Sequence, residues 1–304
     1  MPLAGNCGEV TWRERAIKGQ VVRIISNRYT VRAEGKDYIC TPRGLLRLQD
    51  DIFAGDMVEF SKIGEKRGII TKVLPRKNYL IRPNVANLDK AFIVIAPEPA
   101  PDLLLVDKML IHCFAQGIEP ILCYNKIDIA DNIELAQIEH DYLDIAQLIV
   151  TSAITGKGLE GLAAQIKGGL SCFLGQSATG KSSLLNALLD QEVAKTGELS
   201  QRIKRGKNTT RHIEIYAVKE GLVADTCGFS MLSCLEMHPE ELRLFYDEYL
   251  ASAAKCKYPS CTHSIEPDCQ VIKQVQKGLL PKGRYQRYLT ILEELKEKER
   301  KKYG

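Results

Sequence analysis

The sequence has no apolar run of the about 18 to 20 residues that a membrane-spanning helix needs. Its N-terminus lacks the charged-then-apolar segment and the small-residue cleavage site of a secretory signal. No internal repeat or low-complexity segment occurs in its 304 residues. These absences argue against a membrane or secreted protein, so we expect a cytoplasmic chain of about two or three domains.

A strong net charge is also missing, because the formal charge is only +4. Its distribution is uneven: basic residues outnumber acidic ones by 13 to 9 in residues 1–75, 6 to 1 in residues 195–212, and 10 to 4 in residues 270–304. Such runs suit a polyanionic partner such as RNA. Solvated faces that contact nothing are the alternative, so charge alone does not identify a partner.

Residues 20–73 carry short alternating apolar patterns separated by turn residues such as Gly35 and Gly55. Five strands are predicted, at residues 20–26, 28–33, 36–40, 57–63 and 68–73, and they favour a small β-barrel of the oligonucleotide-binding type. Several side chains could supply phosphate contacts and stacking surfaces to a nucleic acid: Arg32, Lys36, Arg43, Arg47, Tyr29 and Tyr38. A purely structural barrel with its aromatics in the core is the alternative.

Residues 74–88 contain Pro75 and Pro83 among polar residues, which is typical of a linker. Beyond them, buried-type strands at 91–96, 120–124, 147–150 and 170–174 alternate with helical patterns at 103–115, 134–143 and 159–166. This alternation predicts a doubly wound parallel sheet, which binds its ligands at the carboxyl ends of the strands.

A phosphate-binding loop of the form G-x-x-x-x-G-K-[ST] lies between a predicted strand and a predicted helix. Its glycines let backbone N–H groups surround phosphate oxygens, and the following helix N-terminus favours negative charge. Lys181 would neutralise the terminal phosphates, and Ser182 would ligate magnesium. The residues assigned to this nucleotide site are Gly175, Gln176, Ser177, Ala178, Thr179, Gly180, Lys181, Ser182 and Ser183.

The tetrapeptide Asn125-Lys126-Ile127-Asp128 ends another predicted strand. A carboxylate at Asp128 can accept from the ring N–H and the exocyclic amine of guanine, a donor pair that adenine does not present. Asn125 would tie neighbouring loops together, and Lys126 would lay its stem along the base. Backbone N–H groups of Ser152 and Ala153, after the next strand, would meet the guanine carbonyl oxygen.

A polar, basic segment at residues 195–212 ends in Thr209-Thr210 before an alternating strand. A threonine hydroxyl there can complete a magnesium shell when a third phosphate is present, and we leave open which of the two does so. The D-x-x-G pattern from Asp225 to Gly228 follows. Asp225 would hold magnesium through water, and the Gly228 N–H would touch the γ-phosphate. An ordinary surface loop is the alternative for residues 195–212.

Four potential metal ligands lie within 14 residues near the C-terminus: Cys256, Cys261, His263 and Cys269. Three thiolates and one imidazole are typical of a closed, structural zinc site. The other seven of the ten cysteines are scattered, which favours reduced thiols over disulfides. Helices are predicted around the cluster at residues 239–254, 270–277 and 285–302.

The guanine motifs precede the phosphate loop, which reverses the usual order. With the N-terminal barrel and the Cys/His cluster, this arrangement resembles the circularly permuted GTPases of the small-ribosomal-subunit-dependent RsgA (YjeQ) family. The resemblance implies a barrel at residues 1–75, a linker at 76–88, a permuted GTPase domain at 89–232 and a mostly helical zinc-binding domain at 233–304. It also implies a GTPase that binds GTP or GDP together with Mg²⁺. This GTPase would act as a monomer on the small subunit and its ribosomal RNA late in assembly, and it would be released on hydrolysis.

The residue that activates the attacking water stays open. Phe229 follows Gly228 and cannot orient water by a hydrogen bond, so we expect slow intrinsic hydrolysis that the small subunit stimulates, as the resemblance implies. Relatives often carry a histidine just before the paired threonines, where this chain has Asn208. His212, Thr210 and Lys181 are the catalytic candidates. Two hypotheses compete with this one. The chain could be an RNA-binding module with a structural nucleotide and negligible turnover, or it could be a permuted GTPase that acts on the large subunit.

Overall fold

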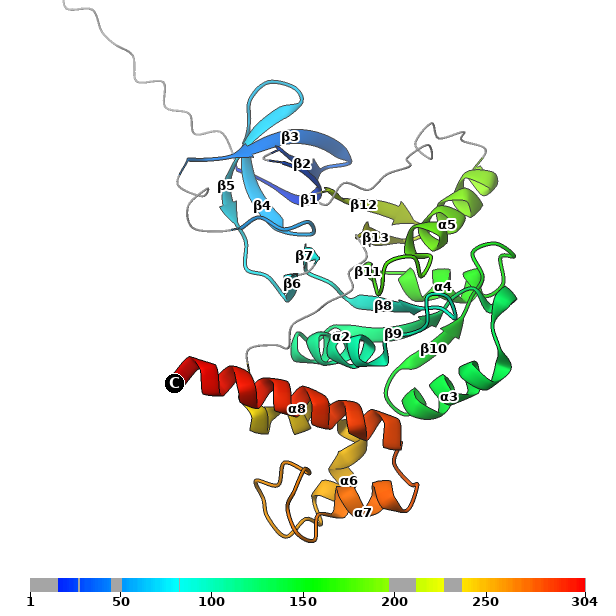
Figure 1. The fold of residues 1–304 in the computed structure, drawn as a ribbon. Coiled ribbons are helices and arrows are strands. Elements are labelled where there is room, and N and C mark those ends of the chain that lie inside the picture. Colours follow the sequence, from blue (N-terminus) through cyan, green and yellow to red (C-terminus); the bar gives the residue numbers. More distant parts are fainter. Residues whose placement is uncertain are drawn as a thin grey trace, which may run out of the picture.

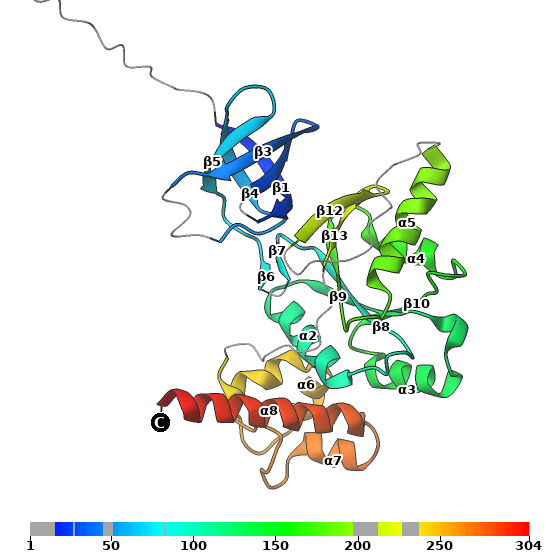
Figure 2. The ribbon, with the colours of Figure 1, turned by 45° about the horizontal axis from the view of Figure 1, so that its top comes forward.

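The computed structural model describes residues 16–26, 28–44, 51–81, 83–196, 212–226 and 237–303. A β-barrel lies at one end of the chain's central α/β unit and a group of helices lies at the other end, as two views show (Figures 1 and 2). In the described part of the chain, no helix is long and apolar enough to cross a membrane.

The N-terminal unit is a closed five-stranded barrel. Its strands are β1 (Ile17–Ile25), β2 (Arg28–Ala33), β3 (Lys36–Pro42), β4 (Met57–Lys62) and β5 (Arg67–Val73). β1 pairs with both β2 and β4, and β3 runs parallel to β5, so the sheet closes on itself. All five strands expected from the alternation are confirmed. Their apolar residues, such as Val21, Val31 and Phe60, point to one side of the sheet and fill one core.

The barrel aromatics correct one expectation. Tyr38 is 3% exposed and packs against Phe60 with ring centroids 5.2 Å apart, so it belongs to the core and offers no stacking surface to a nucleic acid. Arg32 donates two hydrogen bonds to Asp37, at 2.8 and 3.1 Å. Arg47 lies outside the described residues.

The segment expected to be a linker, residues 76–88, is a small packed hairpin. β6 (Tyr79–Ile81) pairs antiparallel with β7 (Asn84–Ala86), and Val85 forms a parallel bridge to Ala54 of the barrel. Leu80, Val85 and Leu88 are buried in the core that the hairpin shares with the central α/β unit. The hairpin therefore fixes the barrel against its neighbour.

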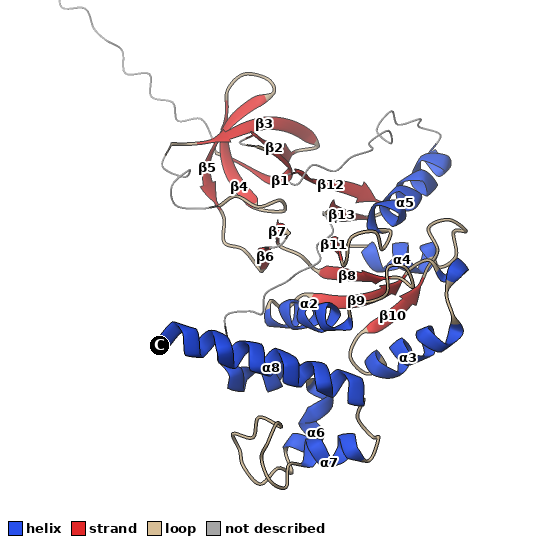
Figure 3. Cartoon of the chain, viewed as in Figure 1, coloured by secondary structure: helices blue, strands red, loops and turns tan. Residues whose placement is uncertain are grey.

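The central unit is a parallel sheet covered by helices on both faces (Figure 3). Its elements are β8 (Lys90–Ile95), α2 (Leu103–Ala115), β9 (Glu119–Tyr124), α3 (Asn132–Tyr142), β10 (Gln147–Val150), α4 (Leu159–Ile166), β11 (Leu170–Leu174), α5 (Lys181–Thr196), β12 (His212–Val218) and β13 (Gly221–Asp225). α2 and α3 cover one face with a core around Leu110. α4 and α5 cover the other face with a core around Leu162. The doubly wound fold is thus confirmed.

The strand order explains how a permuted sequence builds this sheet. The order is β10-β9-β8-β11-β13-β12, with parallel pairing from β10 to β13 and the antiparallel strand β12 at the end. The chain lays down β8, β9 and β10 on one side before it returns to place β11 and β13 on the other. The winding reverses between β8 and β11, which is where ligands bind in open α/β sheets.

The sheet continues into the barrel. β12 pairs antiparallel with β1, with Ile24 opposite Ile213, and the Arg23 side chain lies 3.6 Å from the Glu214 carboxylate. The β12 edge of the central sheet is thereby covered, and eleven strands form one hydrogen-bonded sheet in the described part of the chain.

The C-terminal helices pack on the α2 face of the central unit. They are the 3₁₀ helices η2 (Pro239–Phe245) and η3 (Asp247–Tyr249), then α6 (Leu250–Ala253), α7 (Gln270–Gln276) and α8 (Lys282–Tyr303). The single helix expected at residues 239–254 is wrong. Tyr246 leaves the helical region with φ −123° and ψ 73°, and its ring stacks on Tyr249 at 5.1 Å and meets Tyr288 edge-on at 4.9 Å. Aromatic packing outweighs helical continuity there.

Candidate functional site

The phosphate-loop motif connects β11 to α5, as the sequence predicted. Two of its glycines are required by their surroundings. Gly175 has φ +132°, and a Cβ there would lie 2.3 Å from the Val94 carbonyl oxygen. Gly180 has φ +93°, and a Cβ there would lie 2.3 Å from the Asn125 amide nitrogen. Only glycine fits both positions, because the loop combines left-handed backbone with close approach to its neighbours.

Lys181 is almost buried, at 6% exposure, although it carries a charge. Its ammonium group donates to the Gly175 carbonyl at 3.0 Å and to the Gln176 carbonyl. These bonds hold the Lys181 ammonium group against the backbone of the phosphate loop. A buried cation beside backbone N–H groups at a helix start favours an anionic ligand such as phosphate.

Asn125 joins the base motif to the phosphate loop. Its side chain is 1% exposed and donates to the Thr179 carbonyl at 3.0 Å. The same side chain accepts from the Thr151 hydroxyl at 3.2 Å and from the Ala153 N–H at 3.3 Å. Three segments that are far apart in sequence therefore meet at one amide group, as expected from the sequence.

Asp128 lies exposed at the end of β9, where a ligand can reach its carboxylate. The Ser152 hydroxyl donates to this carboxylate at 2.5 Å and accepts from the Thr155 N–H at 3.1 Å. The Ser152 N–H itself donates to the Lys157 carbonyl at 3.0 Å. Ser152 thus orients the carboxylate through its hydroxyl, whereas the sequence suggested only its N–H group.

The magnesium candidates Ser182 and Asp225 lie at the same edge of the sheet. Ser182 is in the first turn of α5, and Asp225 ends β13, the parallel neighbour of β11. Parallel strands that are adjacent bring their carboxyl ends together. Thr209, Thr210 and Gly228 lie outside the described residues, and of His212 only the backbone is described, at the start of β12.

The loop between β8 and α2, residues 96–102, was not assigned a role from the sequence. The Lys126 ammonium group donates to its Glu98 carbonyl at 2.6 Å. The Gln176 side chain accepts from the Asp102 N–H at 3.0 Å. One signal could have found this loop, since it follows a buried strand at the point where the winding reverses.

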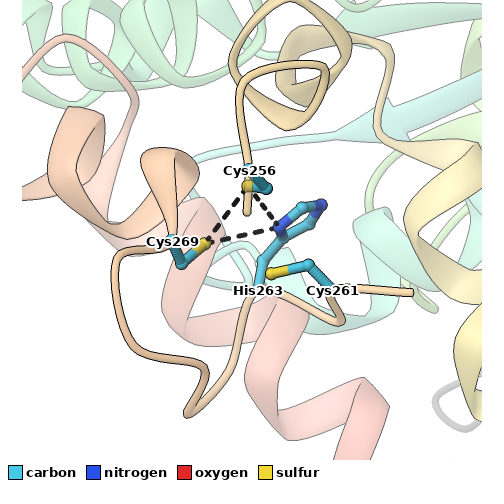
Figure 4. A group of neighbouring side chains, drawn as sticks. All are labelled: Cys256, Cys261, His263 and Cys269. Atoms are coloured by element: carbon cyan, nitrogen blue, oxygen red, sulfur yellow. Dashed lines mark hydrogen bonds between the residues drawn. The ribbon is translucent and has the colours of Figure 1, made fainter. Parts of the chain in front are cut away.

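The four residues of the Cys/His cluster converge, and Figure 4 shows them around a common centre. All four potential ligand atoms lie within 4.8 Å of one another. The His263 Nδ1 atom is 3.4 Å from the Cys269 sulfur, and the Cys256 and Cys269 sulfurs are 3.9 Å apart. Ligand atoms of a tetrahedral zinc site lie about 3.8 Å apart. The donor set therefore fits a metal ion with a preference for sulfur and imidazole.

The surroundings of the cluster are built to hold it. His263 is 1% exposed and has φ 56°, and its carbonyl accepts from the Tyr285 hydroxyl at 2.8 Å. Burial raises the pKa of the Cys261 thiol to about 12, because a thiolate loses its hydration there. A bound cation reverses that preference by stabilising the thiolate. Three thiols placed this close together are consistent with a metal centre.

Glu266 fixes the loop between two of these ligands. Its carboxylate accepts from the Thr262 N–H at 2.6 Å and hydroxyl at 2.7 Å, and from the Ser264 N–H at 2.9 Å. Burial alone would raise the pKa of Glu266, but these hydrogen bonds outweigh burial and lower the pKa to about 2. The loop is thus held by an ionised carboxylate.

Comparison with protein families agrees with this arrangement. The family described as RsgA GTPase matches residues 73–235, and the RsgA N-terminal domain matches residues 18–70. The family described as 50S ribosome-binding GTPase matches residues 171–301.

Curated relatives are similar along nearly the whole chain. The small ribosomal subunit biogenesis GTPase RsgA of Caldanaerobacter subterraneus is 40% identical over 291 residues, which cover 94% of this chain and 98% of the relative. Among solved structures, YjeQ from Thermotoga maritima has a TM-score of 0.77 and 33% identity, over 92% of this chain and 98% of that one. YloQ, a circularly permuted GTPase, has a TM-score of 0.74 and 28% identity, over 96% of this chain and 99% of that one.

Proposed function

This chain belongs to the RsgA GTPase family, and on that premise we propose that it binds the small ribosomal subunit and acts late in its assembly. It is a GTP hydrolase with the motifs in circularly permuted order. Its relatives are named for biogenesis of the small subunit. Hydrolysis of bound GTP to GDP would release the protein from the subunit.

The observation that best supports binding of a guanine nucleotide is the position of Asn125. Its side chain connects the Thr179 carbonyl in the phosphate loop to Thr151 and Ala153 beside the base motif. A ligand that occupies both motifs must place phosphates at one end and a base at the other. The exposed Asp128 carboxylate, oriented by Ser152, selects the donor pair of guanine.

Within this site, each residue has a distinct task. Lys181 stabilises charge on the terminal phosphates as the bond to the leaving oxygen breaks. Ser182 and Asp225 would hold Mg²⁺, directly and through water, and Thr209 or Thr210 would complete the shell. When bound, the ion would supply charge neutralisation to the terminal phosphates. The Gly228 N–H would contact the γ-phosphate.

Turnover by the chain alone should be slow. The residue after Gly228 is Phe229, which has no group to orient water. Binding to the small subunit would then supply the missing alignment. His212 is the weakest of the catalytic candidates, because in the sequence it follows the paired threonines rather than preceding them.

The Cys/His cluster would hold one structural Zn²⁺ ion. Three sulfurs and the His263 Nδ1 atom leave no open coordination position for a reaction, which indicates a structural role. Such an ion fixes the short elements between η3 and α7, which bury few apolar side chains of their own.

Ribosomal RNA is the proposed contact of the barrel and the C-terminal helix. Exposed basic residues lie on the barrel at Lys18, Arg28, Lys36, Arg43, Lys66, Arg67 and Lys72, and at the end of α8 at Lys298, Arg300, Lys301 and Lys302. Contacts of this kind bind phosphates with little sequence preference. We further propose that the protein is a cytoplasmic monomer.

A turnover assay tests the proposed function. Inorganic phosphate release from GTP is measured for the full chain alone, with purified small subunits, and with purified large subunits. Strong stimulation by small subunits only is expected. Equal, near-zero rates in all three mixtures would refute the enzyme as proposed.

Base selection is tested at Asp128. Asp128→Asn should shift the preference from GTP toward xanthosine triphosphate, because the amide presents a donor where the carboxylate presents an acceptor. Xanthine carries the matching carbonyl. Retained selectivity for GTP would show that another residue reads the base.

The large subunit is a second candidate partner because the 50S ribosome-binding GTPase family matches residues 171–301. That match covers the phosphate loop and the C-terminal helices but not the barrel. Co-sedimentation of the GTP-bound protein with separated subunits distinguishes the two partners.

A further inference from the structure

The helix α2 lies between the nucleotide site and the C-terminal helices. Its N-cap is Asp102, whose side chain accepts from the Leu105 N–H at 3.0 Å. Figures 1 and 2 both show α2 beside α8, and the two helices are in contact. The helix thus has one end at the phosphate loop and one face against the C-terminal unit.

At the phosphate-loop end, the Gln176 side chain accepts a hydrogen bond from the Asp102 N–H at 3.0 Å. The base motif reaches the same loop, since Lys126 donates to the Glu98 carbonyl at 2.6 Å. Residues from both halves of the nucleotide site therefore hold the segment that starts α2.

Along α2, a buried ionic cluster docks the C-terminal unit. Asp107 is 0% exposed and accepts from Arg284 Nη1 and from Arg287 Nε, each at 2.6 Å. Tyr142 of α3 donates to the same carboxylate at 2.8 Å. Arg284 also donates to Glu248 at 2.5 Å. The cluster joins α2 and α3 to η3 and α8.

A cluster of this kind has two discrete states. When docked, the Arg284 and Arg287 guanidinium groups pair with carboxylates that are almost fully buried. Partial separation would leave a charge buried without a partner, which is strongly unfavourable. The C-terminal unit is therefore either docked on α2 or released from it, and a small bias at α2 shifts that equilibrium.

We propose that Gln176 is a positioning residue that couples the occupancy of the phosphate loop to docking of the C-terminal unit through α2. Phosphates bound by the loop's backbone hold Gln176 in place, because its side chain extends from the same loop. A fixed Gln176 holds the first turn of α2, and this keeps Asp107 aligned with Arg284 and Arg287. Nucleotide binding and docking then favour each other by the same factor.

A second link between the two units is covalent, because the D-x-x-G motif at residues 225–228 is followed in sequence by the C-terminal unit; the coupling through Gln176 is separate from it. It runs from Gln176 in the phosphate loop through Asp102 and Asp107 of the α2 region, which precede the loop in sequence. The inference rests on the nucleotide site of the proposed function.

Hydrogen exchange on the full, zinc-loaded chain tests the coupling. Amide exchange in residues 282–292 of α8 is measured with and without saturating GDP. We expect GDP to slow exchange there by at least about five-fold, the lower end of ordinary allosteric couplings. Unchanged or faster exchange with GDP bound would overturn the proposal without any substitution.

Two variants locate the route. In Gln176→Ala, measured at GDP concentrations that saturate the variant, most of the GDP-dependent protection of residues 282–292 should be lost. The contact between Lys126 and the Glu98 carbonyl should account for the protection that is left. Glu293→Gln is the matched control, because Glu293 pairs with Arg300 on the exposed side of α8. Full protection in Gln176→Ala would overturn the assigned route.

Reciprocity supplies an independent measurement. Arg287→Gln weakens docking and should lower GDP affinity by a factor similar to the change in protection, whereas Glu293→Gln should leave GDP affinity unchanged. Unaltered affinity in Arg287→Gln would overturn the coupling. Failure of the wild-type chain to bind GDP would instead overturn the proposed function, so the two failures are distinguishable.

Discussion

Replacing Asn125 by alanine removes the only side chain in the described nucleotide site that bonds to both the phosphate loop and the loop after β10. Three hydrogen bonds are lost, to Thr179, Thr151 and Ala153. Because Asn125 is only 1% exposed, water does not readily replace the hydrogen bonds that its three partners lose. At about 1 kcal/mol for each net hydrogen bond, the loss is about 3 kcal/mol.

That free energy divides between folding and ligand binding. If the loops separate in the free protein, GDP must realign them, and 3 kcal/mol corresponds to about a 100-fold loss of affinity. If the loops stay aligned, the loss appears in stability. We expect GDP affinity to fall by about 10- to 100-fold, and the melting temperature of the nucleotide domain to fall by about 5 to 10 °C.

Titration with a fluorescent GDP analogue and thermal unfolding with and without GDP measure both parts. Asn132→Ala is the control, because the same truncation is made at an exposed position seven residues along, at the start of α3. An affinity for Asn125→Ala within about two-fold of wild type, under about 0.5 kcal/mol, would refute the assignment of Asn125 as the connection between the two motifs.

The remaining predictions concern backbone, metal and pH. Gly180→Ala should reduce GDP affinity by at least about 10-fold, because its Cβ meets Asn125 at 2.3 Å, whereas Gly161→Ala on α4, with nothing within 4 Å, should leave it unchanged. Removing metal with a chelator should speed amide exchange in residues 256–276 while the barrel keeps its exchange rates, and unchanged exchange would argue against a bound metal. Glu266→Gln should destabilise the C-terminal unit by about 1 kcal/mol at pH 7 after screening is allowed for. Hydrogen bonds overcome burial to lower the pKa of Glu266 to about 2, so its contribution is complete above the unfolded pKa and disappears as pH falls from about 4.5 to 2. Melting curves of the two proteins should therefore converge in acid, and a constant difference would contradict this account.

Local patterns predicted much of the fold. The strand at 28–33 and the helices at 103–115 and 159–166 occur with the expected bounds, because strict alternation and one-sided apolar spacing decide local structure. The hairpin at Tyr79–Ala86 was missed. Its prolines and polar residues suggested a linker, and its burial depends on partners in two other units.

The parts of the site that were predicted correctly are those marked by sequence motifs with fixed residue spacing. Asn125 and the phosphate loop lie together as expected, because both follow parallel strands in one sheet. The contacts of Gln176 with Asp102 and of Lys126 with Glu98 were not predicted. They depend on which side chain reaches which backbone atom across the point where the winding reverses, and no local pattern records that.

The pairing of β1 with β12 has a consequence for synthesis of the protein. Ile25 leaves the ribosome about 190 residues before its partner His212, which at about 5 to 20 residues per second is a delay of about 10 to 40 s. During that interval the outer edge of β1 has no partner from the GTPase sheet, although the rest of the barrel can already close. The barrel can therefore join the central sheet only after β12 has been made, along a strand edge that stays open until then.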